Sequence, residues 1–240
     1  MMEKNNSTDS AYVNVLILHL KDHLSNDEIT SFRGAVIHSM DKKPLLFHNH
    51  DEDGFRYAYP LIQYKRIAGK AALVCINQGT EEVNQLLESA PTTFRLKTHE
   101  IDFKIENITS TNHLVRIEDA MITYRLKGWI PLNSSNYTKY KELESMVEKI
   151  QFLEKMLIGN ILSFAKGVNI RFSQDVKCTI MEILGSYQSK VKDVSMQCYD
   201  LLFKTNVSLP EYVGIGKHAS INYGVITRPK NKDDKDSQSD

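Results

Sequence analysis

The sequence predicts an α+β protein with antiparallel sheets, arranged as two tandem units. The first half has the order strand, helix, strand, strand, helix, strand, because β-branched apolar runs alternate there with segments of helical periodicity. The second half begins with a long strand-like stretch and continues with a long amphipathic helix and further strands. A chain of 240 residues can hold two domains of roughly 100–120 residues each. We therefore expect an N-terminal domain at 11–110, a C-terminal domain at 111–228, and disordered tails at 1–10 and 229–240.

Turn and capping residues place the elements of the first half. Ser25-Asn26-Asp27-Glu28 is a capping box that opens a helix ending near Met40, and Pro91 stops a second helix that begins at 79–82. The expected strands are 12–20, 57–67, 70–76 and one or two within 94–108. The order β-α-β-β-α-β is the split βαβ, or ferredoxin-like, arrangement. It puts both helices on one face of the sheet and leaves the other face free to bind a ligand.

The second half shows similar element types without a visible sequence repeat. A β-like stretch at 114–130 precedes a helix at 137–165, in which Gly159 marks a position where a kink or a break could fall. The apolar residues of this helix form one stripe, which favours a core-packed helix over a coiled-coil partner helix. The stripe consists of Leu143, Met146, Val147, Ile150, Leu153, Leu157, Ile161 and Phe164. Further strands are expected at 176–184, 194–207 and 220–227.

Composition narrows the class of protein. No apolar run approaches the roughly 20 residues of a transmembrane helix, and the polar N-terminal segment is not a secretory signal. Three cysteines, Cys75, Cys178 and Cys198, are scattered in apolar contexts, which favours free thiols and a cytoplasmic location. The net charge is zero, with 30 basic and 30 acidic residues. Nucleic-acid binders are usually basic, so any basic surface of this chain must be local.

Two histidines one residue apart, His48 and His50, are the first candidates for chemistry. Histidine titrates near neutrality, and on an extended strand both rings would face the same way, so the pair could act as the acid and the base of one reaction. The same spacing suits a metal site completed by Asp51 or Asp53, and a pair of solvated loop histidines is the third interpretation. Nearby acids favour the protonated imidazole, which is a general acid and a poor metal ligand. Spacing alone does not decide between these interpretations.

Aromatic and basic residues follow the histidines. Tyr57, Tyr59 and Tyr64 offer rings for base stacking and hydroxyls for phosphate. Lys65 offers a positive charge to a phosphate under attack. The alternative is an amphipathic strand with exposed tyrosines, and Pro60 within the run indicates an edge strand or a bulge.

A glycine-rich segment lies near the C-terminus. Gly214-Ile215-Gly216-Lys217-His218 is followed by a strand-like segment and not by a helix, so it is not a dinucleotide-binding fingerprint. Its backbone N–H groups, together with Lys217 and His218, could hold phosphate. The alternative is a tight loop between two strands.

Taken together, these motifs resemble the CRISPR-associated repeat-processing endoribonucleases of the RAMP superfamily, in their two-histidine branch. The resemblance covers about residues 12–228. It rests on Phe47-His48-Asn49-His50, on Tyr59-Pro60-Leu61-Ile62-Gln63-Tyr64-Lys65, and on Gly214-Ile215-Gly216 with Tyr223-Gly224-Val225. The chain departs from the family pattern at the end of the loop, where the first of the two glycines that flank the aromatic residue is missing.

The resemblance implies two tandem ferredoxin-like (RRM-like) domains and metal-independent cleavage of precursor CRISPR RNA within its repeats, without a cofactor. It implies His48 and His50 as acid and base, and the chemistry then gives products with a 2′,3′-cyclic phosphate and a 5′-hydroxyl. Lys65 is our candidate for stabilising the charged phosphorane, because of its positive charge. The candidate RNA-binding residues are Tyr57, Tyr59, Tyr64, Gly214, Gly216, Lys217 and His218.

The implied partners are CRISPR repeat RNA and a CRISPR interference complex, with no membrane and with the chain as a monomer or a homodimer. Two other functions stay open. One is a non-catalytic RNA-binding subunit that holds guide RNA, and the other is a metal-dependent enzyme that uses His48, His50 and an acid.

Overall fold

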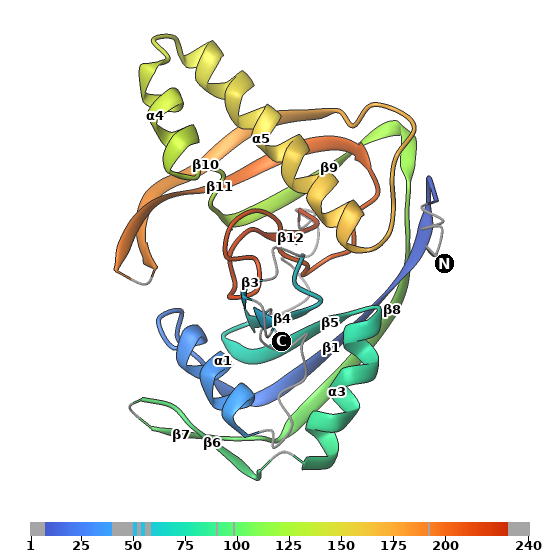
Figure 1. Cartoon of the computed structure of the whole chain (residues 1–240), viewed down its shortest axis with the longest axis vertical. Helices are drawn as coiled ribbons and strands as arrows, with labels where there is room; N and C mark the ends of the chain where they lie inside the picture. Colours follow the sequence, from blue (N-terminus) through green and yellow to red (C-terminus); the bar gives the residue numbers. More distant parts are fainter. Residues whose placement is uncertain are drawn as a thin grey trace, which may run out of the picture.

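The computed structural model describes residues 8–39, 50–51, 54–55, 59–89, 91–97, 99–191 and 193–229. These residues form two four-stranded antiparallel sheets, one in each half of the chain, with helices beside them (Figure 1). The predicted fold class, α+β with two tandem ferredoxin-like units, is confirmed. In the part of the chain that the structure describes, no helix is long and apolar enough to cross a membrane.

The N-terminal sheet has the strand order β4-β5-β1-β8. Its strands are β1 (Ala11–His23), β4 (Ile62–Ile67), β5 (Lys70–Ile76) and β8 (Ile105–Val115). Helix α1 (Ile29–His38) connects β1 with the segment before β4, and α3 (Gln78–Ser89) follows β5. Two small hairpins complete this half, β2 (His50–Asp51) with β3 (Gly54–Phe55) and β6 (Thr93–Arg95) with β7 (Glu100–Asp102).

Two boundaries in this half differ from the prediction. The strand expected at 57–67 begins only at Ile62. The carboxylate of Glu28 accepts hydrogen bonds from both the backbone N–H and the hydroxyl of Ser25, at 2.9 and 2.7 Å. In a capping box, the serine hydroxyl would instead accept the backbone N–H of the glutamate. The helix therefore begins at Ile29, one turn later than a capping box on Ser25 requires.

The C-terminal sheet repeats the same order with β10-β11-β9-β12. Its strands are β9 (Ile117–Trp129), β10 (Cys178–Val191), β11 (Val194–Val207) and β12 (Val225–Thr227), and its helices are α4 (Ser134–Glu142) and α5 (Met146–Gly167). The strand predicted at 220–227 is real only from Val225 onward, because residues 217–220 and Asn222 form turns and Ile221 makes an isolated bridge. The segment between β11 and β12, residues 208–224, is called the glycine loop below.

The long helix predicted at 137–165 is divided, but not at Gly159. It breaks at Leu143, whose backbone is extended, and restarts behind Ser145. Ser145 and Glu148 form a reciprocal capping box, in which each side chain bonds to the other residue's backbone N–H at 3.1 Å. This S-x-x-E signature was present in the sequence and predicts the break better than the glycine does.

The core-packed interpretation of the stripe is confirmed for its C-terminal part. Leu153, Leu157, Ile161 and Phe164 are buried against the sheet. At the start of α5 the stripe leaves the core, and Met146 is 69 % exposed.

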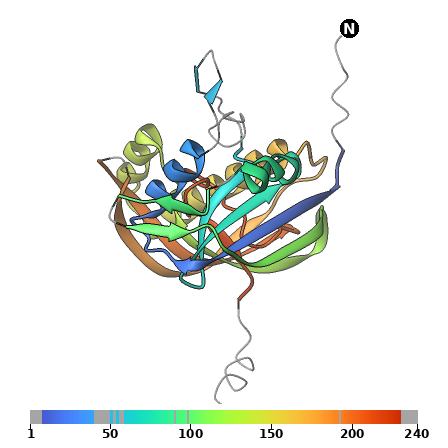
Figure 2. The same cartoon turned by 90° about the horizontal axis from the view of Figure 1, so that it is seen from below.

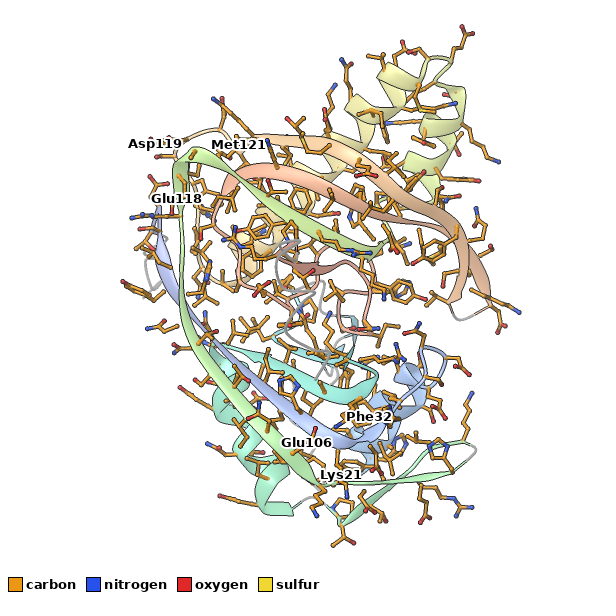
Figure 3. The ribbon with its side chains drawn as sticks, turned by 180° about the vertical axis from the view of Figure 1, so that it is seen from behind. Lys21, Phe32, Glu106, Glu118, Asp119 and Met121 are labelled. Atoms are coloured by element: carbon orange, nitrogen blue, oxygen red, sulfur yellow. The ribbon has the colours of Figure 1, made fainter. Side chains whose placement is uncertain are left out.

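One hydrophobic cluster joins the two halves. It contains Val15 and Val74 of the N-terminal sheet together with Leu157 of α5 and Leu201 of β11. The helices of both halves lie on one side of the molecule and the strands on the other (Figure 2). The opposite, open face of the sheets is seen in Figure 3, with Lys21 and Glu106 on the N-terminal sheet.

Candidate functional site

The glycine loop lies between the two sheets and covers the free edge of β4 (Figure 1). The backbone N–H of Tyr64 donates to the carbonyl of Ser220 at 2.7 Å, and the N–H of Arg66 donates to the side-chain oxygen of Asn222 at 3.1 Å. Tyr64 and Ile221 form an isolated parallel β-bridge. An edge strand exposes unpaired backbone groups, and here the loop of the other half satisfies them.

Three side chains from the β4 segment, Tyr59, Gln63 and Lys65, hold this loop and are called the latch. The hydroxyl of Tyr59 donates to the carbonyl of Gly214 at 2.8 Å. The N–H of Gly214 donates to Oε1 of Gln63 at 2.8 Å, and Nε2 of Gln63 donates to the Tyr59 hydroxyl at 2.8 Å. The three groups form a closed ring of hydrogen bonds, and Gln63 is fully buried. Closed, satisfied polar networks of this kind fix one geometry.

Lys65 supplies the third contact of the latch. Its Nζ donates to the carbonyl of Ala219 at 2.8 Å, and its side chain is 0 % exposed. Burial lowers the pKa of this lysine to about 7. An ammonium group enclosed in this way cannot reach a substrate phosphate, so the prediction that Lys65 stabilises the phosphorane by contact is corrected. In this structure Lys65 positions the glycine loop.

Three glycines are required by how closely the loop packs. A Cβ on Gly214 would lie 2.6 Å from Nζ of Lys65 and 2.8 Å from two backbone carbonyl oxygens. Gly216 has φ +86 and lies against the indole of Trp129. Gly224 has φ +59, and a Cβ there would lie 1.8 Å from the carbonyl oxygen of Ile215. Because Gly214 uses its N–H and its carbonyl inside the protein, its predicted contact with RNA is also corrected.

Both halves of the chain match known domain models. Residues 11–114 match the model described as the Cas6b N-terminal domain, and residues 116–229 match the Cas6b C-terminal domain. The chain belongs to the Cas6b family. A relative in Methanocaldococcus jannaschii, Uncharacterized protein MJ0978, is 34% identical over 113 residues, which cover 47% of this chain and 76% of that protein.

Solved structures of Cas6 proteins share the fold. One described as Cas6b is 22% identical with a TM-score of 0.81, covering 91% of this chain and 100% of that chain. A second, described as CRISPR RNA processing endoribonuclease Cas6b, is also 22% identical with a TM-score of 0.69, covering 92% and 100%. A third, described as Csf5, CRISPR-Cas type IV Cas6 crRNA endonuclease, is 10% identical with a TM-score of 0.55, covering 91% and 100%.

The glycine missing from the family pattern is replaced by Asn222. Its φ is +68, in the left-handed region that asparagine tolerates better than most residues. Its side-chain oxygen also accepts the N–H of Arg66 at 3.1 Å, which a glycine could not do. In this Cas6b-family chain the substitution keeps the turn and adds a contact to β4.

The predicted tyrosines have packing roles. Tyr64 is 0 % exposed, and its ring packs edge-on against Phe32 with centroids 5.8 Å apart. No base can stack on it, so its predicted contact with RNA is corrected. Tyr59 is half-buried against Phe164, with ring centroids 5.2 Å apart, and burial raises the pKa of its hydroxyl. The sequence predicts no role for Gln63, which lies two residues before Lys65 on β4 and contacts the glycine loop as Lys65 does.

Lys217 and His218 lie on the outer part of the glycine loop and are partly exposed. The N–H of Lys217 donates to the carbonyl of Ile130 at 3.2 Å, which fixes its backbone. His218 has φ +58, and its ring lies 6.1 Å from that of Tyr223. Contact of these two residues and of Gly216 with RNA stays a prediction.

The histidine pair is only partly placed. His48 and Tyr57 lie outside the described residues, as does the side chain of His50. The backbone of His50 belongs to β2 and pairs with Phe55. The β2–β3 hairpin stands on the helix side of the molecule, over the junction between the two halves (Figures 1 and 2).

Proposed function

We propose that this chain is an endoribonuclease that cleaves precursor CRISPR RNA within its repeats. The observation that carries the proposal is the match of both halves to the two Cas6b domain models. A similar solved structure is described as a CRISPR RNA processing endoribonuclease. The glycine loop fixed at the junction of the halves, and the His50 strand on the same side of the molecule as the helices, are consistent with an RNA site there.

The proposed mechanism needs no metal ion. The RNA 2′-hydroxyl attacks the adjacent phosphorus and loses its proton to one histidine of the pair His48 and His50. The other histidine gives a proton to the departing 5′-oxygen. The upstream (5′) fragment then ends in a 2′,3′-cyclic phosphate, and the downstream (3′) fragment begins with a 5′-hydroxyl. General acid–base catalysis of this kind typically contributes about 10²–10⁴-fold.

The remaining residues bind and position the RNA. Gly216, Lys217 and His218 form the contact surface of the glycine loop. The latch residues hold that surface from behind without touching the RNA. A cation such as Lys217 neutralises one phosphate, which is the usual sequence-independent part of RNA affinity.

The test is cleavage of a cognate repeat RNA in EDTA by His48→Ala and His50→Ala. We expect each variant to lose roughly 10²-fold or more in rate while wild type keeps its activity. His38→Ala is the matched control, because that residue is exposed and its ring bonds, among the described residues, to the carbonyl of Gly34 in its own helix. Mass spectrometry of the upstream fragment distinguishes a cyclic phosphate at its 3′ end from a linear one.

Undiminished cleavage by both histidine variants would exclude the mechanism. Cleavage by wild type that EDTA abolishes would favour a metal-dependent enzyme. Tight binding of the repeat without any cleavage by wild type would favour the RNA-binding subunit.

A further inference from the structure

A cavity of about 570 Å³ opens beside the glycine loop, between the start of α4 and the β10–β11 hairpin. Asn133 and Tyr137 line it from the helix side, Gln188, Ser195 and Gln197 line it from the hairpin, and Lys217 lines it from the loop. Its volume falls in the range of pockets that hold small ligands. The three latch residues are not among the described residues that line it.

The charge of the lining suits an anion. Lys217 is its one charged residue, and no aspartate or glutamate is among the lining residues that the structure describes. Nζ of Lys141 lies 4.7 Å from the centroid of the Tyr137 ring, so a second positive charge contacts one of the lining side chains. The other lining groups are mainly amides, hydroxyls and one aromatic ring, which can face a nucleobase.

The hairpin side of the cavity is held in place by its own hydrogen bonds. Nε2 of Gln188 donates to Oε1 of Gln197 at 2.7 Å, and the hydroxyl of Ser195 donates to Oε1 of Gln188 at 3.1 Å. Gln197 is anchored in turn through Nε2 to the hydroxyl of Ser186 at 2.9 Å. Within the described residues, Gln188 thus keeps one amide N–H and one oxygen lone pair for a ligand. A donor and an acceptor side by side match the edge of a base.

The loop side is equally fixed. Gly216, just before Lys217, lies so close to Trp129 that a Cβ would be 3.0 Å from the indole. The indole N–H is itself held by Asn160 at 2.8 Å. This packing therefore fixes the backbone from which the Lys217 side chain reaches the cavity.

We propose that this cavity binds one unpaired nucleotide of the RNA, with its phosphate on Lys217 and its base between Tyr137 and Gln188. The inference rests on the proposed function in that the RNA is the substrate. It adds a base-contacting subsite on the C-terminal half of the chain. The subsite would select RNAs by the presence of an accessible base at one fixed position.

The test measures binding of fluorescent repeat RNA in the His48→Ala/His50→Ala background, which keeps the RNA intact. Tyr137→Leu preserves an apolar side chain against the core and removes the aromatic ring, and Lys217→Gln removes the charge. Lys155→Gln is the control, because Lys155 is exposed on α5 and does not line the cavity. Stacking on an aromatic ring predicts a loss of about fivefold or more for Tyr137→Leu. We expect a similar loss for Lys217→Gln and less than about a twofold change for Lys155→Gln, since exposed charges act weakly.

A scan with abasic nucleotides identifies the bound base without relying on a variant fold. One abasic position should weaken RNA binding by the same factor as Tyr137→Leu. The same abasic RNA should bind the Tyr137→Leu variant no more weakly than the intact RNA does. The subsite would be overturned if Lys217→Gln alone weakened RNA binding and no abasic position depended on Tyr137. Such a result would leave a simple phosphate contact. Equal affinity in all variants would also overturn it. Wild type that cleaves nothing, with the coupling retained, would support the subsite and refute the nuclease.

Discussion

The two halves of the molecule share one sheet order but differ in the segment that follows the third strand. In the N-terminal half that segment is the helix α3, which buries Val83 and Leu86. In the C-terminal half it is the glycine loop, which has no helix. The loop instead has five residues with positive φ, namely Tyr212, Gly216, His218, Asn222 and Gly224. A helix satisfies its own backbone, whereas this loop gives part of its backbone to the neighbouring half.

The edges of the two sheets differ as a result. The glycine loop covers β4, the edge strand of the N-terminal sheet. The equivalent strand β10 pairs only with β11 among the described strands, and Met181 and Leu184 on it are 52 % and 40 % exposed. Two register shifts within β10 interrupt its edge, a common protection against unwanted pairing. The glycine loop thus joins the two halves of the molecule. We therefore expect substitutions in this loop and in the latch to lower the unfolding free energy most.

The largest effect is expected from Gly224→Ala. The new Cβ would lie 1.8 Å from the carbonyl of Ile215, and φ +59 is unfavourable for alanine. Overpacking and left-handed strain together predict a loss of about 4 kcal/mol in unfolding free energy, or a Tm lower by about 10 °C. Gly159→Ala is the control, because that helical glycine has nothing within 4 Å of its Cβ. It should gain roughly 0.5–1 kcal/mol, and equal melting of the two variants would contradict the packed loop.

Gln63→Leu should be the next most damaging change. It leaves the N–H of Gly214 without its acceptor and removes the donor to the Tyr59 hydroxyl. Each buried group left unpaired costs about 1–3 kcal/mol, so we expect a loss of about 3 kcal/mol. Gln151→Leu, on the exposed face of α5, should stay within about 0.5 kcal/mol of wild type. Faster hydrogen exchange at Gly214 would locate the damage, and unchanged exchange there would refute the latch.

Much of this could be predicted from the sequence, including the break before α5 that its capping box marks, but the latch could not. The order of elements, the core stripe of α5 and the loop position all follow from local periodicity and turn chemistry. The latch does not, because Gln63 and Lys65 have the pattern of an exposed amphipathic strand until a segment about 150 residues away covers them. Polar residues with alternating spacing cannot show from sequence alone whether water or another backbone satisfies them.

Lys65 should make the stability of the joint depend on pH. Its folded pKa of about 7 lies below the ordinary value of 10.5, so between these values the unfolded chain binds a proton that the folded chain does not. Stability of wild type should therefore rise with pH across this window, by up to about 1.4 kcal/mol per pH unit. Lys65→Met has no ionisable group at this position and so lacks this pH dependence of stability. The difference between wild type and Lys65→Met should shift by about 2 kcal/mol in favour of wild type from pH 7 to pH 9.

Urea unfolding of the two proteins at pH 7, 8 and 9 measures this shift. Lys155→Met is the control, because Lys155 is an exposed residue of α5. Parallel stability curves for wild type and Lys65→Met would show that Lys65 remains charged in the fold.

The smallest effect separates two roles of Asn222. Asn222→Ala loses both the tolerance of φ +68 and the acceptor for the N–H of Arg66, which predicts a loss of about 1–2 kcal/mol. Asn222→Gly restores the glycine of the family pattern and loses only the acceptor. Because the Arg66 N–H lies at the surface, water can replace that bond, and Asn222→Gly should stay within about 0.5 kcal/mol of wild type. If glycine proved as damaging as alanine, the hydrogen bond to β4 and not the backbone conformation would be the reason for asparagine at this position.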